Sequence, residues 1–438
     1  MHAYQAMETE ELYAIYCRHP YVTTDSRNCP EGSIFFALKG ANFDGNAYAV
    51  QALREKGCAA AVVDNPEVAV SDSRLILVDD VLTALQRLAA YHRKMWGGTI
   101  LQITGTNGKT TTKELVSAVL SQGKRVLSTK GNFNNHIGVP LTLLSIRPEE
   151  HDIAVVETGA NHPGEIANLC QLVQADYGLI TCVGRAHLEG FGSFEGVKRT
   201  KGELYDDLRQ RGGSIFLDGQ NADLVQMAQQ RGFEPGARVV PYVQGRVERL
   251  TPYVQMSWCE PETATWHSVD THLIGAYNLP NLLAAVTVGL HFGIRPEQID
   301  AALSGYQPTN SRSELREVHG NRLIVDAYNA NPSSMAAALS NFAMIDAEHK
   351  MVILGDMREL GAESLEEHRS IVRRLEAMQL DRIWLVGEAF GEVATKGMRI
   401  FPDVEAVMEA LAANPIRDTT ILIKGSNGTR LHKLPEAF

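Results

Sequence analysis

The segment from Gly105 to Thr111 has the composition of a phosphate-binding loop. An apolar run, Thr99 to Thr104, leads into it, and a helical apolar stripe follows. Two glycines let successive backbone N–H groups approach an anion, a lysine adds charge, and a threonine hydroxyl can coordinate Mg²⁺. Ile103 stands where the general pattern has its first glycine. The predicted loop comprises Gly105, Thr106, Asn107, Gly108, Lys109, Thr110 and Thr111.

Three further side chains have types that suit a site beside bound phosphate. Glu157 ends the apolar run Ile153 to Glu157, and His187 follows the run Tyr177 to Val183. Ligands of open α/β sheets bind at the carboxyl ends of the strands. Each residue could also have no functional role: Glu157 could be a solvated acid at a strand end, and His187 could be a packed structural histidine. Lys201, which the pattern places near a helix start, reads by itself as a surface charge.

Alternating strands and helices must position these residues. In the central part, short apolar runs alternate with helical patterns that begin at Thr110, Gly164 and Val197. This alternation predicts right-handed crossovers and a mainly parallel sheet covered on both faces. Residues 238–272 alternate polar and apolar side chains, which predicts an antiparallel appendage.

The chain length predicts three α/β domains, because 438 residues exceed what one hydrophobic core serves. We place a small amino-terminal domain at residues 1–95, a central phosphate-loop domain at 96–312 and a doubly wound domain at 313–438. The third domain is predicted from a second alternating series, with strands at Arg322 to Asp326, Lys350 to Gly355, Arg382 to Val386 and Thr420 to Lys424.

Composition excludes several classes of protein. The net charge of −11 argues against nucleic-acid binding, which needs clustered basic residues. The six cysteines include no C-x-x-C pair, which favours reduced thiols in the cytoplasm. The amino terminus has no apolar segment typical of a signal peptide, and no run is long enough to span a membrane. We expect a cytoplasmic monomer.

Taken together, motifs along nearly the whole chain resemble the Mur ligase superfamily. They are Gly105-Thr-Asn-Gly-Lys-Thr110, Glu157, Ala186-His-Leu-Glu189, Lys201-Gly-Glu203, Gly275-Ala-Tyr-Asn278 with Asn281, and Arg312. Further motifs resemble the branch that adds a D-alanyl dipeptide. They are Thr24-Asp-Ser-Arg27, Phe35-Phe-Ala-Leu-Lys-Gly40, Phe43-Asp-Gly45, Asp326-Ala-Tyr-Asn-Ala-Asn-Pro332 and Gly355-Asp-Met-Arg-Glu-Leu-Gly361.

The resemblance implies roles for individual residues. For ATP, it implies adenine contacts from Asn278 and Asn281, phosphate contacts from Arg312, and a ribose or closed-state contact from Asp326. For Mg²⁺, it implies one ion at Thr110 and Glu157, and a second at His187 and a carbamylated Lys201. For the nucleotide precursor, it implies Ser26 and Arg27 near the UDP end and Asn134 and Asn135 at the substrate cleft. Lys109, His187 and Lys201 would be the catalytic residues.

The implied reaction joins D-alanyl-D-alanine to UDP-N-acetylmuramoyl-tripeptide through an acyl phosphate, with ATP and Mg²⁺. Three alternatives compete with it. The ligase one step earlier carries an acceptor motif, D-N-P-R, that is absent here. Folylpolyglutamate synthetase usually continues its loop as Gly-Lys-Gly-Ser. A regulatory protein that has lost turnover would not need intact Lys109, Glu157 and Lys201.

Overall fold

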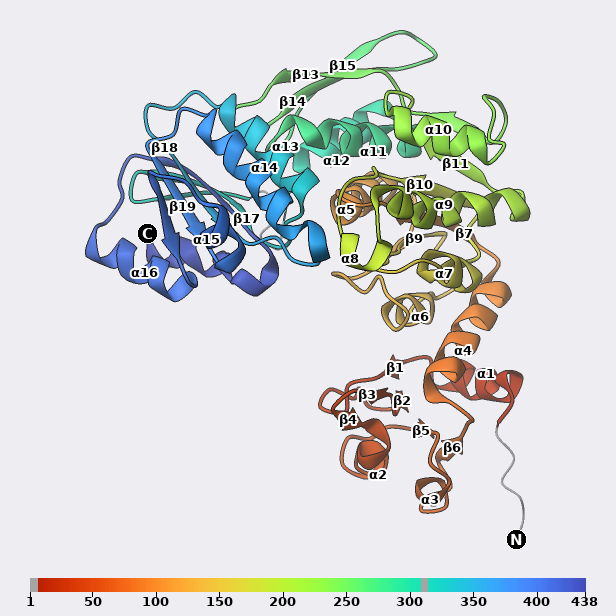
Figure 1. Ribbon diagram of the computed structural model, residues 1–438. Coiled ribbons are helices and arrows are strands. Elements are labelled where there is room, and N and C mark those ends of the chain that lie inside the picture. Colours follow the sequence, from red (N-terminus) through yellow and green to blue (C-terminus); the bar gives the residue numbers. More distant parts are fainter. Residues whose placement is uncertain (1–6, 309–313) are drawn as a thin grey trace.

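A computed structural model describes residues 7–308 and 314–438 of the chain, and it consists of three α/β units in sequence order (Figure 1). Each unit is built on its own sheet with helices packed against it, and the two larger sheets have six strands each. The predicted class, a three-domain α/β protein with mainly parallel sheets, is confirmed. None of the helices in the described ranges is both long and apolar enough to cross a bilayer.

The amino-terminal unit is a small parallel sheet of order β1-β2-β5-β6 with a β3-β4 hairpin beside it. Alternate side chains of β2 point to opposite faces, so Phe35 packs with α2 whereas Ile34 and Phe36 pack with α1 and α4. The strands are β1 (Val22–Thr23), β2 (Ile34–Phe36), β3 (Lys39–Gly40), β4 (Phe43–Asp44), β5 (Ala60–Val63) and β6 (Leu75–Leu77). The helices are α1 (Thr9–Arg18), α2 (Ala49–Arg54), α3 (Pro66–Ala69) and α4 (Val81–Trp96).

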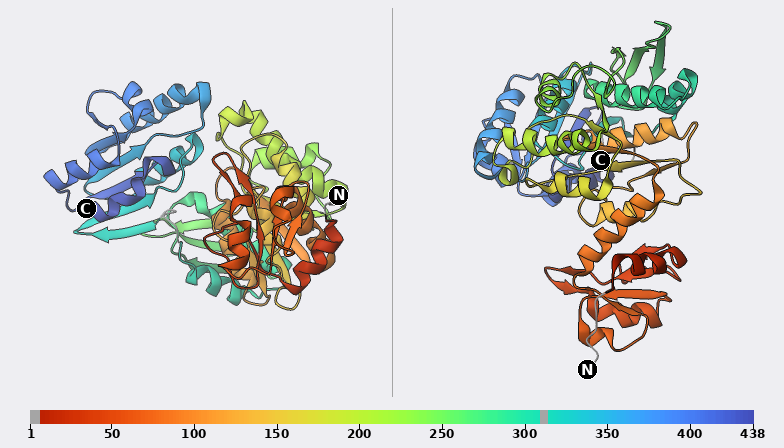
Figure 2. Two further views of the ribbon diagram at one scale, coloured as in Figure 1. Left: turned by 90° about the horizontal axis from the view of Figure 1, so that it is seen from below. Right: turned by 90° about the vertical axis from the view of Figure 1, so that its right-hand side faces the viewer.

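Helix α4 connects this unit to the rest of the molecule (Figure 2). Its start is capped by the Asp80 carboxylate, which accepts a hydrogen bond from Thr83 N. Gly97 ends the helix in the left-handed conformation, with φ of 64°. His92 of α4 contacts both domains, since its Nε2 lies 3.3 Å from Tyr16 Oη and 3.0 Å from Ile146 O. The first two units are therefore joined by buried polar contacts as well as by the chain.

The central unit is a parallel sheet of order β12-β11-β10-β7-β9-β8. Its strands are β7 (Thr99–Thr104), β8 (Val126–Ser128), β9 (Ile153–Glu157), β10 (Tyr177–Ile180), β11 (Ser214–Leu217) and β12 (Val239–Pro241). Its helices are α5 (Lys109–Leu120), α6 (Gly138–Leu143), α7 (Glu165–Val173), α8 (Leu188–Phe191), α9 (Phe194–Arg211), α10 (Ala222–Gln230), α11 (Leu279–His291) and α12 (Pro296–Gly305). A small antiparallel sheet comprises β13 (Gly245–Arg249), β14 (Gln255–Cys259) and β15 (Trp266–Asp270).

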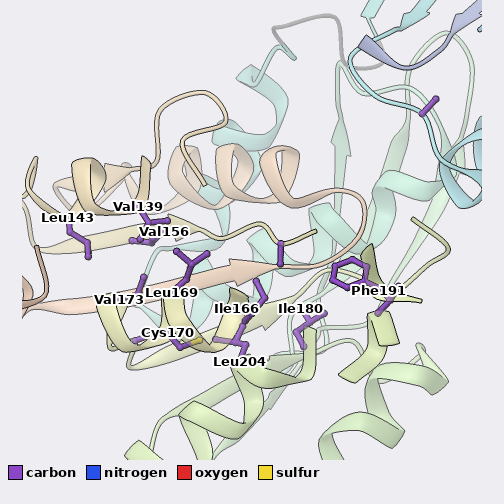
Figure 3. Packing of buried hydrophobic residues seen from close by; sticks show 14 of the residues in the cluster. Val139, Leu143, Val156, Ile166, Leu169, Cys170, Val173, Ile180, Phe191 and Leu204 are labelled. Carbon is purple, nitrogen blue, oxygen red and sulfur yellow. The ribbon is translucent and has the colours of Figure 1, made fainter. Parts of the chain in front are cut away.

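Both faces of the central sheet are buried, which explains why its strands are continuously apolar. On one face, apolar side chains of α6, α7 and α9 meet those of β9 and β10 (Figure 3). The labelled members of this layer are Val139, Leu143, Val156, Ile166, Leu169, Cys170, Val173, Ile180, Phe191 and Leu204. On the other face, α5 and α11 pack on the strands. This packing fixes the strand ends at which the predicted site lies.

Three predictions for the central unit were wrong in detail. The strand expected to reach Val183 ends at Ile180, because Thr181 Oγ1 and Cys182 O bond the phosphate loop instead of a neighbouring strand. The helix expected from Val197 begins at Phe194, capped by Ser193, so Lys201 lies inside it and not at its start. Residues 239–241, expected in the antiparallel appendage, form the parallel edge strand β12.

The third unit is a doubly wound sheet of order β16-β17-β21-β18-β19-β20, in which only the edge strand β16 runs antiparallel. Its strands are β16 (Glu314–Val318), β17 (Asn321–Asp326), β18 (Lys350–Gly355), β19 (Arg382–Val386), β20 (Met398–Phe401) and β21 (Thr420–Lys424). Its helices are α13 (Pro332–Ala343), α14 (Ser364–Glu376), α15 (Glu388–Val393) and α16 (Val404–Ala413). Helices α13 and α14 face the central unit (Figure 1).

Candidate active site

The predicted phosphate loop lies between β7 and α5, and both of its glycines are required. Gly105 and Gly108 have φ of 142° and 79°, which side-chain-bearing residues rarely adopt. A Cβ on Gly105 would overlap Thr181 Oγ1, and one on Gly108 would lie 2.7 Å from Asn281 Oδ1. Lys109 Nζ donates to Gly105 O at 2.8 Å and Thr106 O at 3.0 Å. The loop is therefore a tightly packed backbone turn that holds its lysine.

A cavity of about 1030 Å³ opens above this loop, lined mainly by residues of the central and third units, with Gln86 of α4 from the amino-terminal unit. The predicted site residues among its described lining are Thr106, Asn107, Gly108, Lys109, Thr110, Thr111, Asn134, Asn135, Glu157, His187, Asn278, Asn281 and Asp326. Gly105 is not part of this lining, and Arg312 falls outside the described residues. The fold thus brings together residues that the sequence separates by more than two hundred positions.

Glu157 presents one carboxylate oxygen without a protein partner. The side chain is 1% exposed, and its Oε1 accepts a hydrogen bond from Asn134 Nδ2 at 2.7 Å. Its Oε2 is buried and has no hydrogen-bond partner within the described chain. Buried polar atoms normally have partners, so an orphaned carboxylate oxygen in a cavity marks a place for a ligand. Neighbouring Asn135 instead accepts from Ile137 N and Gly138 N, which orders the start of α6.

Lys201 is buried behind the cavity wall. Its side chain reaches from α9 so that Nζ donates to Ala160 O at 3.3 Å and lies 5.4 Å from the centre of the Phe191 ring. Burial, and secondarily the nearby charge of Lys109, lower the pKa of Lys201 to about 7. A sizeable fraction of this lysine is therefore an uncharged amine near neutral pH.

His187 lies at the boundary between the central and third units. It has a left-handed backbone with φ of 51°, uncommon outside glycine. Its Nδ1 pairs with the carboxylate of Glu359 from the third unit. Burial lowers the pKa of His187, and the positive charges of Lys109 and Lys201 lower it further, while Glu359 raises it. The net result is a histidine that is mainly neutral at pH 7.

The end of the cavity at α11 contains the two asparagines expected to meet adenine. Asn281 Nδ2 donates to Asn278 Oδ1 at 2.8 Å, and Asn281 Oδ1 accepts from Thr112 Oγ1 at 3.0 Å. Asn278 in turn donates to Ile274 O at 2.9 Å. Both amides are thus oriented by α5 and by the turn before α11, which couples this end of the cavity to the phosphate loop.

The third unit contributes a lysine that the sequence reading missed. Lys424 at the end of β21 is 1% exposed, and its Nζ donates to Asp326 Oδ2 at 2.6 Å and to Asn329 O at 3.2 Å. Both Asp326 and Lys424 line the large cavity. The sequence did carry a signal for Lys424, because this lysine directly ends an apolar strand, just as Glu157 ends β9.

Side-chain contacts hold the third unit against the phosphate loop. Asn107 and Asn331 exchange two amide hydrogen bonds, of 3.4 and 2.8 Å. Arg185 N donates to Ser333 Oγ at 2.8 Å, and its guanidinium pairs with Glu367 at 2.8 Å and Glu363 at 3.3 Å. Asn107, a residue of the predicted phosphate loop, therefore contacts the third unit directly. Sequence reasoning did not find Arg185 or Asn331 as partners.

Ser26 and Arg27 lie in the amino-terminal unit and do not belong to the described lining of the cavity. The guanidinium of Arg27 pairs with Asp25 at 2.9 Å, and the Arg27 side chain is 89% exposed. The structure does not bring these two residues to the phosphate loop.

Comparison with known proteins identifies the class to which this fold and site belong. Family models match as "Mur ligase family, catalytic domain" at residues 20–93, "Mur ligase middle domain" at 103–289 and "Mur ligase, glutamate ligase domain" at 311–427. The chain belongs to the Mur ligase family and is a ligase.

Similar relatives cover nearly the whole chain. The UDP-N-acetylmuramoyl-tripeptide–D-alanyl-D-alanine ligase of Bacillus subtilis is 34% identical, over 94% of this chain and 92% of the relative. The ligase of the same name from Escherichia coli is 34% identical, over 95% and 93%. Crystal structure I of MurF from Acinetobacter baumannii superposes with a TM-score of 0.84 at 32% identity, over 95% and 92%. MurF of Thermotoga maritima in complex with ADP gives 0.83 at 25%, over 95% and 96%.

Proposed function

We propose that this chain uses ATP to join D-alanyl-D-alanine to UDP-N-acetylmuramoyl-tripeptide, the reaction after which its curated relatives are named. The product is a peptidoglycan precursor, so the reaction contributes to cell-wall synthesis and thereby to cell shape and division. The observation that carries the proposal is one cavity lined by both a phosphate loop and a second α/β unit. Such a cavity can hold a nucleotide and two further reactants in contact.

The chemistry follows from the poor reactivity of a carboxylate. In the proposed reaction, an oxygen of the tripeptide carboxylate attacks the γ-phosphorus of ATP, and the bond to ADP breaks. The amine of the dipeptide then attacks the acyl carbon, loses a proton, and expels inorganic phosphate. Lys109 and the loop N–H groups stabilise the transferring phosphoryl group, while the units hold the reactants in line.

The residues present fit Mg²⁺. Glu157 offers a buried oxygen without a partner in the described chain, and Thr110, whose hydroxyl is of a type that binds Mg²⁺, lines the same cavity. No group of three His, Cys, Asp or Glu side chains in residues 7–308 and 314–438 could bind a metal unaided. Phosphate oxygens, a hydroxyl and single carboxylates are the ligands that nucleotide-bound Mg²⁺ uses. The ion would neutralise charge on the phosphates.

Lys201 fits a carbamate at a second Mg²⁺. An amine must be uncharged to add CO₂, and burial beside Lys109 supplies that condition. The carbamate would replace a buried cation by an anion near His187 and the loop. This would also remove the repulsion between the two lysines. His187, with its Nδ1 on Glu359, retains Nε2 as a possible ligand atom.

The remaining assignments extend the proposal to the substrates. Asn278 and Asn281 would contact adenine, Asp326 the ribose, and Arg312 the phosphates. Ser26 and Arg27 would bind the UDP end on the amino-terminal domain, and Asn134 and Asn135 the donor peptide. We propose domains at residues 1–95, 96–312 and 313–438, and a monomer that works in the cytoplasm, where ATP is supplied and its six thiols stay reduced.

Phosphate release tests the function directly. The purified protein is incubated with ATP, Mg²⁺ and UDP-N-acetylmuramoyl-tripeptides that differ in their third residue, each with D-alanyl-D-alanine. We expect stoichiometric ADP, phosphate and pentapeptide product with at least one of them. Phosphate release with glutamate and folate, or with a single diamino acid as the acceptor, would assign a different reaction. The absence of turnover with all substrates would contradict the proposal.

A further inference from the structure

A second, smaller cavity lies beside the nucleotide cavity, at the junction of the central and third units. Its volume is about 220 Å³. It is lined by Ala186, His187, Asn329, Ala330, Asn331, Arg358, Glu359, Ser426, Asn427 and Gly428. His187 and Asn329 line both cavities, so the two spaces adjoin. A molecule in the small cavity can therefore present one end to the phosphate loop.

Among the described residues that line this small cavity, Arg358 is the arginine and carries a permanent positive charge. It is exposed, and it packs so closely on Gly428 that a Cβ there would collide with the guanidinium. No hydrogen bond or ion pair of its side chain occurs within residues 7–308 and 314–438, whereas nearby Arg185 and Arg430 pair with glutamates. The N–H groups of the Arg358 guanidinium are thus available to donate hydrogen bonds to a ligand.

The acceptor of an amide ligase has two ends, an amine that reacts and a far end that does not, and the enzyme must bind each of them at a different place. Its amine must reach the activated carboxyl group near the phosphate loop, so its other end must point away from Lys109. For a dipeptide with a free carboxyl terminus, that other end is an anion. A guanidinium binds a carboxylate through two parallel hydrogen bonds. The small side chains of Ala330 and Ser426, which also line this cavity, suit the methyl groups of such a dipeptide.

We propose that Arg358 binds the terminal carboxylate of the acceptor dipeptide and selects acceptors that carry a free carboxylate. This inference rests on the proposed function, because the acceptor is taken from it. Arg358 would touch the substrate far from the reacting carbon. Its loss is therefore expected to weaken acceptor binding more than the chemical step.

The test compares two acceptors and three variants of the full chain. Initial rates are measured with D-alanyl-D-alanine and with its carboxyl-terminal amide, for wild type, Arg358→Met and Arg373→Met. Arg373 is a matched control, because it is an exposed arginine of the same unit that pairs with Glu366 on the surface of α14. Circular dichroism and ATP KM verify that each variant is folded.

We expect wild type and Arg373→Met to prefer the free acid over the amide by about tenfold to a hundredfold in kcat/KM, as a charge-assisted pair provides. Arg358→Met should lose this preference, through a higher KM for the free acid and an unchanged KM for ATP. If Arg358→Met still discriminates like wild type, Arg358 does not bind the carboxylate. If wild type does not ligate D-alanyl-D-alanine at all, the proposed function fails instead.

Discussion

The side-chain nitrogen of Lys201 lies 3.3 Å from the carbonyl oxygen of Ala160, a residue of the cavity wall, and is sealed from solvent. A permanent cation there would be costly, and its neighbour Lys109 is also basic. This relationship gives the carbamate proposal a direct test. Lys201→Ala should lower kcat by about a hundredfold or more, since an anionic ligand near the phosphates is lost.

Formate or acetate should restore part of the activity of Lys201→Ala, because a small carboxylate can occupy the vacated space and present oxygen to Mg²⁺. Lys201→Arg should not be restored, since it keeps a positive charge. Steady-state rates at increasing acetate concentration measure the effect. Full activity of Lys201→Ala, together with density for an unmodified amine, would refute the carbamate.

Lys109→Ala should reduce ligation by about a thousandfold, because the transferring phosphoryl group loses its nearest side-chain charge. Binding of the UDP precursor should change little, since Ser26 and Arg27 lie in another unit. Calorimetric titration of the precursor and a coupled ADP assay separate the two quantities. Near-normal turnover would contradict the phosphate-loop assignment.

Arg27→Ala should raise the KM for the UDP precursor about tenfold while the ATP KM changes little, because Arg27 lies outside the nucleotide cavity. Arg74→Ala is the matched control. Arg74 belongs to the same unit and pairs with Asp72 two residues before it, as Arg27 pairs with Asp25. A selective rise in the ATP KM, or equal effects of both variants, would show that the UDP site is misplaced.

The contact of Arg185 with Glu367 predicts control of domain closure. Arg185→Glu places like charges opposite each other, so the third unit should separate from the phosphate loop. Small-angle scattering should then show a larger radius of gyration with ATP and precursor bound than wild type shows. The reversed pair, Arg185→Glu with Glu367→Arg, should recover compactness. Identical dimensions of all proteins, with and without ligands, would argue against closure.

The joint between the first two units should weaken in mild acid. Burial lowers the pKa of His92 below its usual 6.5. Unfolding therefore takes up a proton as pH falls below 6.5, so the stability that depends on neutral His92 is present above that pH and is lost toward the folded-state pKa. Thermal melts from pH 7.5 to 5 measure it. His92→Gln, which cannot titrate, should show a shallower slope, and an unchanged slope would exclude His92 as the cause.

Local patterns were sufficient for much of the fold. The bounds predicted for β7, β9, β18, β19 and β21 match the structure, because a buried parallel strand is a short apolar run with clear ends. The phosphate loop was also readable, since glycines, a lysine and threonines must be adjacent to wrap an anion. Glu157 was found because it ends such a strand, and His187 because it follows one.

Pairing and burial across units could not be read in this way. The periodicity of a segment reports its own backbone, whereas the partner of a side chain depends on how distant segments pack. Asn107 meets Asn331 only because two sheets turn their carboxyl ends toward one cavity. Lys424 meets Asp326, 98 positions away, because β21 and β17 pair side by side in the third sheet. Lys201 looked like a surface charge in its polar helix, and the packing of α9 against the central sheet buries it. The sequence by itself determined the strands and the phosphate loop, while tertiary packing decided which residues share the cavity and which charges lose their water.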